Sequence, residues 1–277
     1  MSIRQHLVKF WIVLFLGIMS VCSVEAQEKE GLLDDLIKKS GMYEQISQLP
    51  AYVQAGMVQQ QAAGISVEKS EVVSRILMEV FQPDILRKDV KNYLKDALEV
   101  NDIQEVLVWL DSSLGMKITK LEEQASTPEA MGEMQQQAEQ LYTQTERVEI
   151  VSRLDEAIKA TDAMVQMIEN MGIAAAIAAM SASEQESEMS QDEVVSMVKQ
   201  GVTQYYDMYK NITIVSFLYS YQILSDEELM EYIQFAESNI GKKYHKAGIE
   251  ALNIAVKNAS KKIGELMVKE FEAGVDE

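Results

Sequence analysis

The sequence predicts an all-α protein, and three observations lead to this prediction. Each of the three prolines stands where a helix could begin, most clearly in Thr127-Pro128-Glu129, where a hydroxyl cap precedes the proline and an acidic residue follows it. Apolar residues recur every three or four positions, as on the buried face of a helix. Strand signals are missing, because the chain has neither an Asn-Gly or Asp-Gly hairpin turn nor a sustained polar-apolar alternation. We expect a bundle of about ten to eleven helices.

The helices of the first half are assigned in chain order from these signals. The first is expected over residues 29–48, and Pro50 begins a second, which Gly64 ends. A third covers residues 66–81, and a fourth runs from Pro83 through Leu98. The fifth begins near a weak capping box, Asn101-x-x-Gln104. It carries one continuous apolar stripe: Ile103, Val106, Leu107, Leu110, Leu114, Ile118 and Leu121.

The second half begins with one long helix, expected over residues 128–170. Capping boxes at Ser190-x-x-Glu193 and Ser225-x-x-Glu228 begin later helices. A last helix, over residues 249–272, has an apolar stripe and no counterpart in the first half. We expect it to cover the end of the core.

One stretch of the chain occurs twice, 126 positions apart. Trp109-x-x-Ser112-x-x-Gly115-x-Lys117 aligns with Phe235-x-x-Ser238-x-x-Gly241-x-Lys243. Residues 33–38 also resemble 154–159, and residues 71–74 match 193–196. Three similar segments in the same order indicate duplication. We therefore expect two tandem pseudo-repeats, residues 27–126 and 127–277.

The repeated Ser-x-x-Gly pair has two interpretations. Residues three apart share one face of a helix, so Ser238 and Gly241 would form a shallow notch. The notch could admit a neighbouring helix or mark a helix end at the glycine. It could instead receive a partner's side chain beside Phe235 and Lys243. Its occurrence at matching positions favours a packing role.

The second copy resembles a known bacterial family. Glu228-Leu229, Phe235, Ser238, Gly241 and Lys243 resemble the Glu-Leu…Phe-x-x-Ser-x-x-Gly-x-Lys core of the domain of unknown function numbered twenty fifty-nine. The resemblance covers about residues 205–255, and Ala236 stands where an aromatic commonly follows the Phe. It implies a small exported helical protein and brings no activity, cofactor or catalytic residue. The candidate interaction residues of the two copies are Trp109, Ser112, Gly115, Lys117, Leu229, Phe235, Ser238, Gly241 and Lys243.

The N-terminus is typical of a signal peptide. A basic start is followed by an uncharged apolar run, residues 10–21, and by small residues that place cleavage after Ala26. The run is shorter than the roughly 20 residues that a membrane anchor needs. Lipidation at Cys22 is disfavoured, because bulky Val21 precedes it. We expect residues 1–26 to be removed and the protein to be periplasmic or secreted.

Composition limits the function classes. The net charge of −19 disfavours nucleic acid and anionic lipid surfaces as partners. The single cysteine, Cys22, leaves with the signal peptide, which excludes a disulfide framework. Of the two histidines, only His245 lies outside the signal peptide, so the ligands of a zinc site are lacking. No cofactor is predicted, and His245 is interpreted as a surface residue.

Methionine and alanine mark two further stretches. Met164, Met167 and Met171 share a helical face and could fill the core, bind copper or form a groove for a client protein. Residues 172–182 are too short to span a membrane and indicate a buried helix, with a lipid-inserted hairpin as the alternative. The acidic residues 184–193 are interpreted as a solvated connector, since the calcium-loop spacing is absent.

The sequence favours a non-enzymatic binding protein. The expected partner is another envelope protein or a small apolar ligand, held in a methionine-rich groove between helices. No nucleophile elbow, phosphate-binding loop or histidine-base arrangement occurs. The alternatives are a carboxylate-dependent hydrolase and a structural spacer of the cell envelope.

Overall fold

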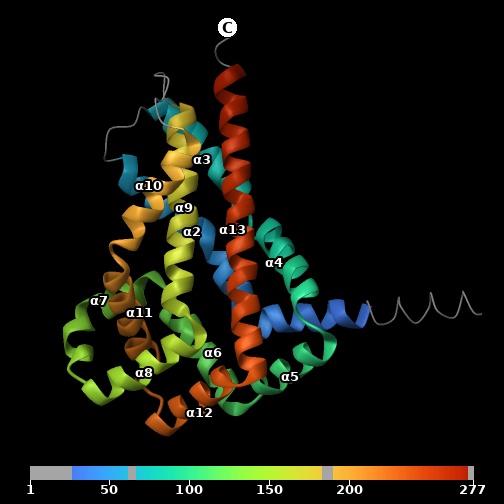
Figure 1. The fold of residues 1–277 in the computed structure, drawn as a ribbon, viewed down its shortest axis with the longest axis vertical. Helices are drawn as coiled ribbons and strands as arrows, with labels where there is room; N and C mark the ends of the chain where they lie inside the picture. Colours follow the sequence, from blue (N-terminus) through green and yellow to red (C-terminus); the bar gives the residue numbers. More distant parts are fainter. Residues whose placement is uncertain (1–26, 62–66, 183–189, 274–277) are drawn as a thin grey trace, which may run out of the picture.

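The computed structural model describes residues 27–61, 67–182 and 190–273 (Figure 1), and all regular secondary structure in these ranges is α-helical. The all-α prediction is confirmed. The predicted signal peptide, the helix end at Gly64 and most of the acidic connector lie outside the described residues. Across the described ranges, every helix is too short or too polar to cross a lipid bilayer.

Thirteen helices are described, more than predicted. A helix over residues 27–39 comes first. It is followed by α2 (Met42–Gln61), α3 (Val67–Val80), α4 (Pro83–Ala97), α5 (Val100–Leu110), α6 (Ser113–Ala125), α7 (Pro128–Tyr142), α8 (Thr145–Ile158), α9 (Ala160–Ala182), α10 (Gln191–Thr203), α11 (Tyr206–Ser220), α12 (Asp226–Glu237) and α13 (Asn239–Ala273). The number is higher mainly because the predicted helix that carries the stripe from Ile103 to Leu121 is two helices and the predicted helix over residues 128–170 is three.

The first break lies at Gly41, before the position that the sequence indicated. Gly41 adopts a φ of 76°, a left-handed conformation that ends the helix over residues 27–39. The chain restarts at Met42, and α2 continues through Pro50. The prediction that Pro50 begins a helix is therefore wrong. Pro83 and Pro128 do stand in the first turn of α4 and α7, as predicted.

The predicted helix over residues 128–170 is three helices. The first break separates α7 from α8. The second is at Lys159, whose φ of 59° is left-handed. Asp155 stabilises this turn, because its carboxylate accepts hydrogen bonds from the Thr161 backbone N–H at 2.7 Å and from the Thr161 hydroxyl at 2.8 Å. Both side chains are buried. A buried carboxylate that caps the next helix is a tertiary feature, which apolar periodicity does not reveal.

The repeated Ser-x-x-Gly pairs are helix starts. Ser112 caps α6 by accepting a hydrogen bond from Gly115 N–H at 3.0 Å, and Ser238 accepts one from Gly241 N–H at the same distance. The continuous stripe predicted from Ile103 to Leu121 is therefore broken between α5 and α6. The prediction of a capping box at Asn101 is also wrong.

The turns before these two helices are so tight that each requires its glycine. A Cβ atom on Gly115 would lie 2.1 Å from the carbonyl oxygen of Trp109. A Cβ atom on Gly241 would lie 1.9 Å from that of Phe235. The obstacle is backbone in both cases, so no side-chain rotation relieves the overlap.

Two hydrophobic clusters form the core. The boundary between them does not coincide with residue 126, which separates the two predicted halves of the chain. The first holds the helix over residues 27–39, α3 to α5 and α13, with contributions from α2 and α9. The second holds α6, α7, α8, α11 and α12. The hairpin of α5 and α6 therefore spans both clusters, and so does the junction of α12 and α13. In Figure 1, α13 runs from α12 along the length of α9, and it begins at Asn239, well before the predicted last helix over residues 249–272.

Replacing Gly115 or Gly241 with alanine is expected to lower the free energy of unfolding by roughly 2–4 kcal/mol, because the new Cβ atom overlaps a backbone carbonyl. Gly132→Ala is the matched control. Nothing lies within 4 Å of a Cβ atom on Gly132, which is inside α7, so alanine should stabilise the protein by about 0.5–1 kcal/mol. Urea titration of the three variants measures both effects. Similar small effects at all three positions would contradict the requirement for glycine.

Candidate functional site

The two repeated segments meet at an aromatic stack. The rings of Trp109 and Phe235 lie 4.4 Å apart, centre to centre, with an angle of 7° between their planes. Each side chain packs against both hydrophobic clusters. The two residues occupy the same position in the two similar segments, so each segment places its ring directly on the matching ring of the other.

Ion pairs between the two similar segments follow the same reciprocal pattern. Lys117 Nζ lies 2.7 Å from a Glu228 oxygen, and Lys243 Nζ lies 2.5 Å from an Asp102 oxygen. Glu228 and Asp102 are themselves equivalent, since each closes the capping box that begins α12 or α5. The pKa of Glu228 is lowered by its hydrogen bond with Lys117. A lysine of α6 thus reaches the start of α12, and a lysine of α13 reaches the start of α5.

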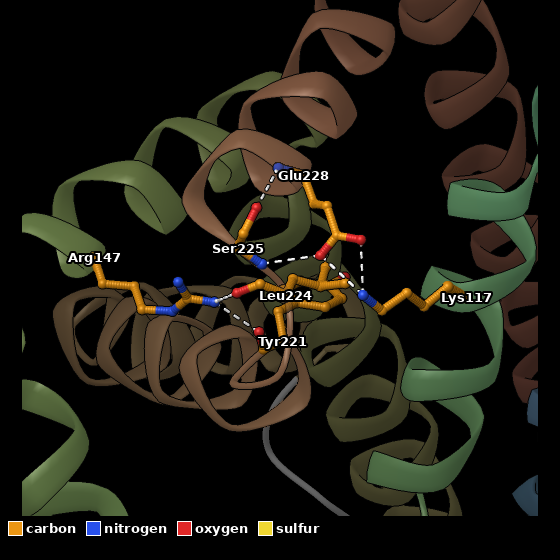
Figure 2. A network of polar contacts seen from close by, with 6 residues as sticks. All are labelled: Lys117, Arg147, Tyr221, Leu224, Ser225 and Glu228. Atoms are coloured by element: carbon orange, nitrogen blue, oxygen red, sulfur yellow. Dashed lines mark hydrogen bonds and ion pairs between the residues drawn. The ribbon is translucent and has the colours of Figure 1, made fainter.

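A polar network holds the segment between α11 and α12 (Figure 2). The guanidinium of Arg147 donates to the carbonyl oxygens of Tyr221 and Leu224 at 2.7 and 2.8 Å. On the side opposite Arg147, Ser225 and Glu228 form the predicted capping box at the start of α12. Lys117 also donates a hydrogen bond to the Glu228 carboxylate there. These contacts fix the backbone of Tyr221, whose ring extends into the protein. Arg147 was not singled out by the sequence, because its partners, two backbone oxygens and the Asp226 carboxylate, are more than 70 residues away.

A pocket of about 370 Å³ lies beside the aromatic stack. Six aromatic rings contribute to its wall: Trp109, Phe217, Tyr221, Tyr232, Phe235 and Tyr244. Serine, threonine and methionine side chains complete it. Of the described residues that line this pocket, Glu122 is the one with a carboxylate, and none is lysine or arginine. The volume is within the range of small-molecule sites.

Glu122 is a carboxyl group enclosed by tyrosines. The hydroxyl of Tyr221 donates to Glu122 Oε1 at 2.6 Å. Burial raises the pKa of Glu122 to about 7, and hydrogen bonds with Tyr221 and Tyr232 counteract only part of this increase. The side chain is half-buried, and it borders the pocket. Glu122 therefore changes its charge near neutral pH, unlike an ordinary surface carboxylate.

The interpretation of His245 as a surface residue is wrong. In α13, its ring lies 4.9 Å from that of Tyr244 and 6.1 Å from that of Phe235. Its Nε2 atom is buried, and no atom of the described residues forms a hydrogen bond with it. Burial lowers the pKa of His245 to about 4, so the imidazole is neutral at pH 7. A buried polar atom without a partner is costly and calls for a ligand or water.

The sequence-derived interaction residues gather at this junction but contribute little to the pocket. Trp109, Gly115 and Phe235 line it. Leu229 is buried in the second cluster. The remaining residues form the caps and ion pairs described above. The sequence did not single out Glu122, Tyr221, Tyr232 or Tyr244, and it placed His245 on the surface; all five line the pocket. One signal was present: Glu122 continues the i, i+4 spacing of Leu114 and Ile118 on a buried helix face.

A second, open depression lies between α7 and α11 and is rich in methionine. It is lined by Met131, Met134 and Met208 together with Tyr142, Ile212 and other residues. Met131 and Met208 are 40% and 46% exposed. The methionine face singled out from the sequence lies elsewhere, on α9. There Met164 Sδ accepts a hydrogen bond from the Thr213 hydroxyl at 3.7 Å.

The chain matches no family model, no curated protein and no solved structure. Within the described ranges, no three histidine or carboxylate side chains lie close enough together to hold a metal ion. The case for a function therefore depends on the geometry of the pocket.

Glu122→Gln is expected to stabilise the protein in a pH-dependent way. The pKa of Glu122 is about 7 in the folded state, above its ordinary value of 4.5. The folded protein therefore binds more protons than the unfolded chain between these values, and the stability contributed by Glu122 falls as pH rises through this window. Glutamine does not titrate, so the stability advantage of the variant should grow from pH 4.5 to 7 and then level off, at up to about 3 kcal/mol.

Urea titrations at several pH values measure this difference. The depressed pKa of His245 acts in the opposite direction, because its contribution is lost as pH falls below 6.5. This contribution is present in both proteins and cancels in the comparison. Glu105→Gln, on the exposed face of α5, is the matched control and should show no such trend. A pH-independent effect of Glu122→Gln would contradict the assignment.

Proposed function

We propose that this protein is a non-enzymatic binding protein that holds a small, mainly apolar ligand in the pocket beside the Trp109–Phe235 stack. The observation that carries the proposal is the buried Nε2 atom of His245, which lacks a partner in the described structure although its side chain borders the pocket. A ligand that supplies a hydrogen-bonding group would satisfy this atom. The aromatic wall would bury the apolar part of the same ligand.

The composition of the pocket favours binding over hydrolysis. Carboxylate-dependent hydrolases of the glycosidase type use two carboxyl groups at a fixed separation. Glu122 has no second carboxylate beside it among the described residues that line the pocket. The tyrosine hydroxyl next to it is itself weakly acidic, because burial raises the pKa of Tyr221 well above its ordinary value. Tyr221 therefore serves as a hydrogen-bond donor rather than as a base.

We further propose that the two hairpins are copies of one unit and that the protein works in the periplasm or outside the cell. The first idea is supported by the equivalent caps, the reciprocal ion pairs and the stacked rings. The second rests on the signal-like N-terminus and on the resemblance to the exported helical family. In this arrangement the ligand would lie at the junction between the two copies.

A protein-interaction role is the second candidate, and the depression between α7 and α11 favours it. Exposed methionine and aromatic side chains there form an adaptable apolar surface. This site is separate from the pocket beside the aromatic stack for most of its lining, although Met131 and Met134 contribute to both. The two roles can therefore be tested with different substitutions.

The neutral apolar dye N-phenyl-1-naphthylamine is expected to bind the protein with increased fluorescence. Ser216 lines the pocket and is absent from the wall of the open depression. Ser216→Phe should fill the pocket and reduce dye affinity at least tenfold, whereas Ser216→Ala at the same position should retain it. Met208→Gln makes the open depression more polar and should leave the affinity unchanged.

Circular dichroism and urea titration show whether each variant is folded. Loss of dye binding in Met208→Gln, with full binding in folded Ser216→Phe, would place the ligand in the open depression and overturn the proposal. Absence of dye binding to the unaltered protein would also count against an apolar ligand pocket.

A further inference from the structure

We infer that the pocket selects small organic cations. The ammonium group would lie beside Glu122 and the aromatic rings, and the apolar remainder would lie against the methionine side chains that line the pocket. This inference rests on the proposed binding function and specifies the chemical class of the ligand. It depends on the charges that line the pocket, on the rings and on the state of His245.

The charges that border the pocket have one sign. Glu122 is the acidic residue of the wall, and its described lining contains no lysine or arginine. The basic residues of the junction form ion pairs with other carboxylates: Lys117 pairs with Glu228, Lys243 with Asp102, and Arg147 with Asp226. An anionic ligand would meet a carboxylate with no compensating cation. A cation would neutralise Glu122 and remove the unfavourable burial of its charge.

The aromatic wall fits the same ligand class. Tyr221 and Tyr232 lie edge to face at 6.1 Å, and the Trp109–Phe235 stack adjoins them through Tyr232, whose ring centre is 6.1 Å from that of Trp109. Aromatic faces attract cations through the ring quadrupole, most strongly when water is excluded. Aromatic cages bind quaternary ammonium groups in proteins, and the Glu122 carboxylate that lines the pocket with these rings would add a neutralising charge.

His245 does not oppose a cation, because it is neutral. Burial among aromatic rings lowers its pKa to about 4. Its Nε2 atom can pair with a hydroxyl or an N–H group on the ligand. The pocket therefore offers one negative charge, one neutral nitrogen and a ring of apolar surface.

Proton binding by Glu122 gives a test with a definite sign. The ionisable groups that face Glu122 are Tyr221 at the end of α11, Tyr232 on α12, Tyr244 and His245 on α13, and Glu123 on its own helix. The pKa values of the three tyrosines are raised by burial, so these groups stay neutral below pH 9. A cation binds the ionised form of Glu122, and its affinity should rise with pH. A neutral ligand that accepts a hydrogen bond from the protonated acid should bind less tightly as pH rises.

Choline and its neutral carbon isostere, 3,3-dimethyl-1-butanol, separate charge from shape. In calorimetric titrations of the full protein at pH 8, choline should bind at least tenfold more tightly than the isostere. The affinity for choline should fall about tenfold between pH 8 and pH 6, as Glu122 becomes protonated. Glu122→Gln should remove both the preference and the pH dependence, whereas Glu105→Gln should keep both.

Equal or tighter binding of the neutral isostere would overturn the cation assignment and leave the binding function intact. Failure of both probes would overturn it as well, and the dye experiment would then decide separately whether the pocket binds any ligand. A preference for choline that survives in folded Glu122→Gln would show that the carboxylate is not its source, and the inference would fail in its present form.

Discussion

The stack of Trp109 on Phe235 is the contact on which the rest of the structure depends. Each ring stands six residues before a glycine that allows the chain to reverse direction at close range. The reversal sends the next helix into the opposite hydrophobic cluster. At this junction the two clusters are joined by the α5–α6 and α12–α13 connections, by the Lys117–Glu228 and Lys243–Asp102 ion pairs and by the Trp109–Phe235 stack. Neither cluster is a separate sequence half, and loss of the junction would disturb both.

The junction also explains where the pocket lies. The α5–α6 and α12–α13 connections meet here, and the space beside the stacked rings is bordered by α6, α11, α12 and α13, among other helices. Polar groups in this space are poorly solvated. Glu122 and His245 both have pKa values shifted towards their neutral forms for this reason. Such groups lower stability, and proteins commonly retain a local cost of this kind at functional sites.

The charge of the protein surface also favours cationic ligands. The chain carries a net charge of −19, and most of the ion pairs between helices are exposed. Pairs of this type contribute little to stability individually. The excess of negative charge affects the association of ligands more strongly, because an acidic surface attracts cations and repels anions before either reaches the pocket. The charge of the whole protein and the charge of the pocket wall therefore favour the same ligand class.

Local chemistry in the sequence determined the all-α class, the caps at Thr127, Ser190 and Ser225, and the starts of α4 and α7. These features depend on neighbouring residues, so short-range patterns predict them. The breaks at Gly41, Ser112 and Lys159 were missed, because apolar periodicity continues across a turn when both sides face a core. Only the tertiary structure decided that Glu122 and His245 share a pocket. They lie on different helices 123 positions apart, and no local pattern specifies which helix faces meet.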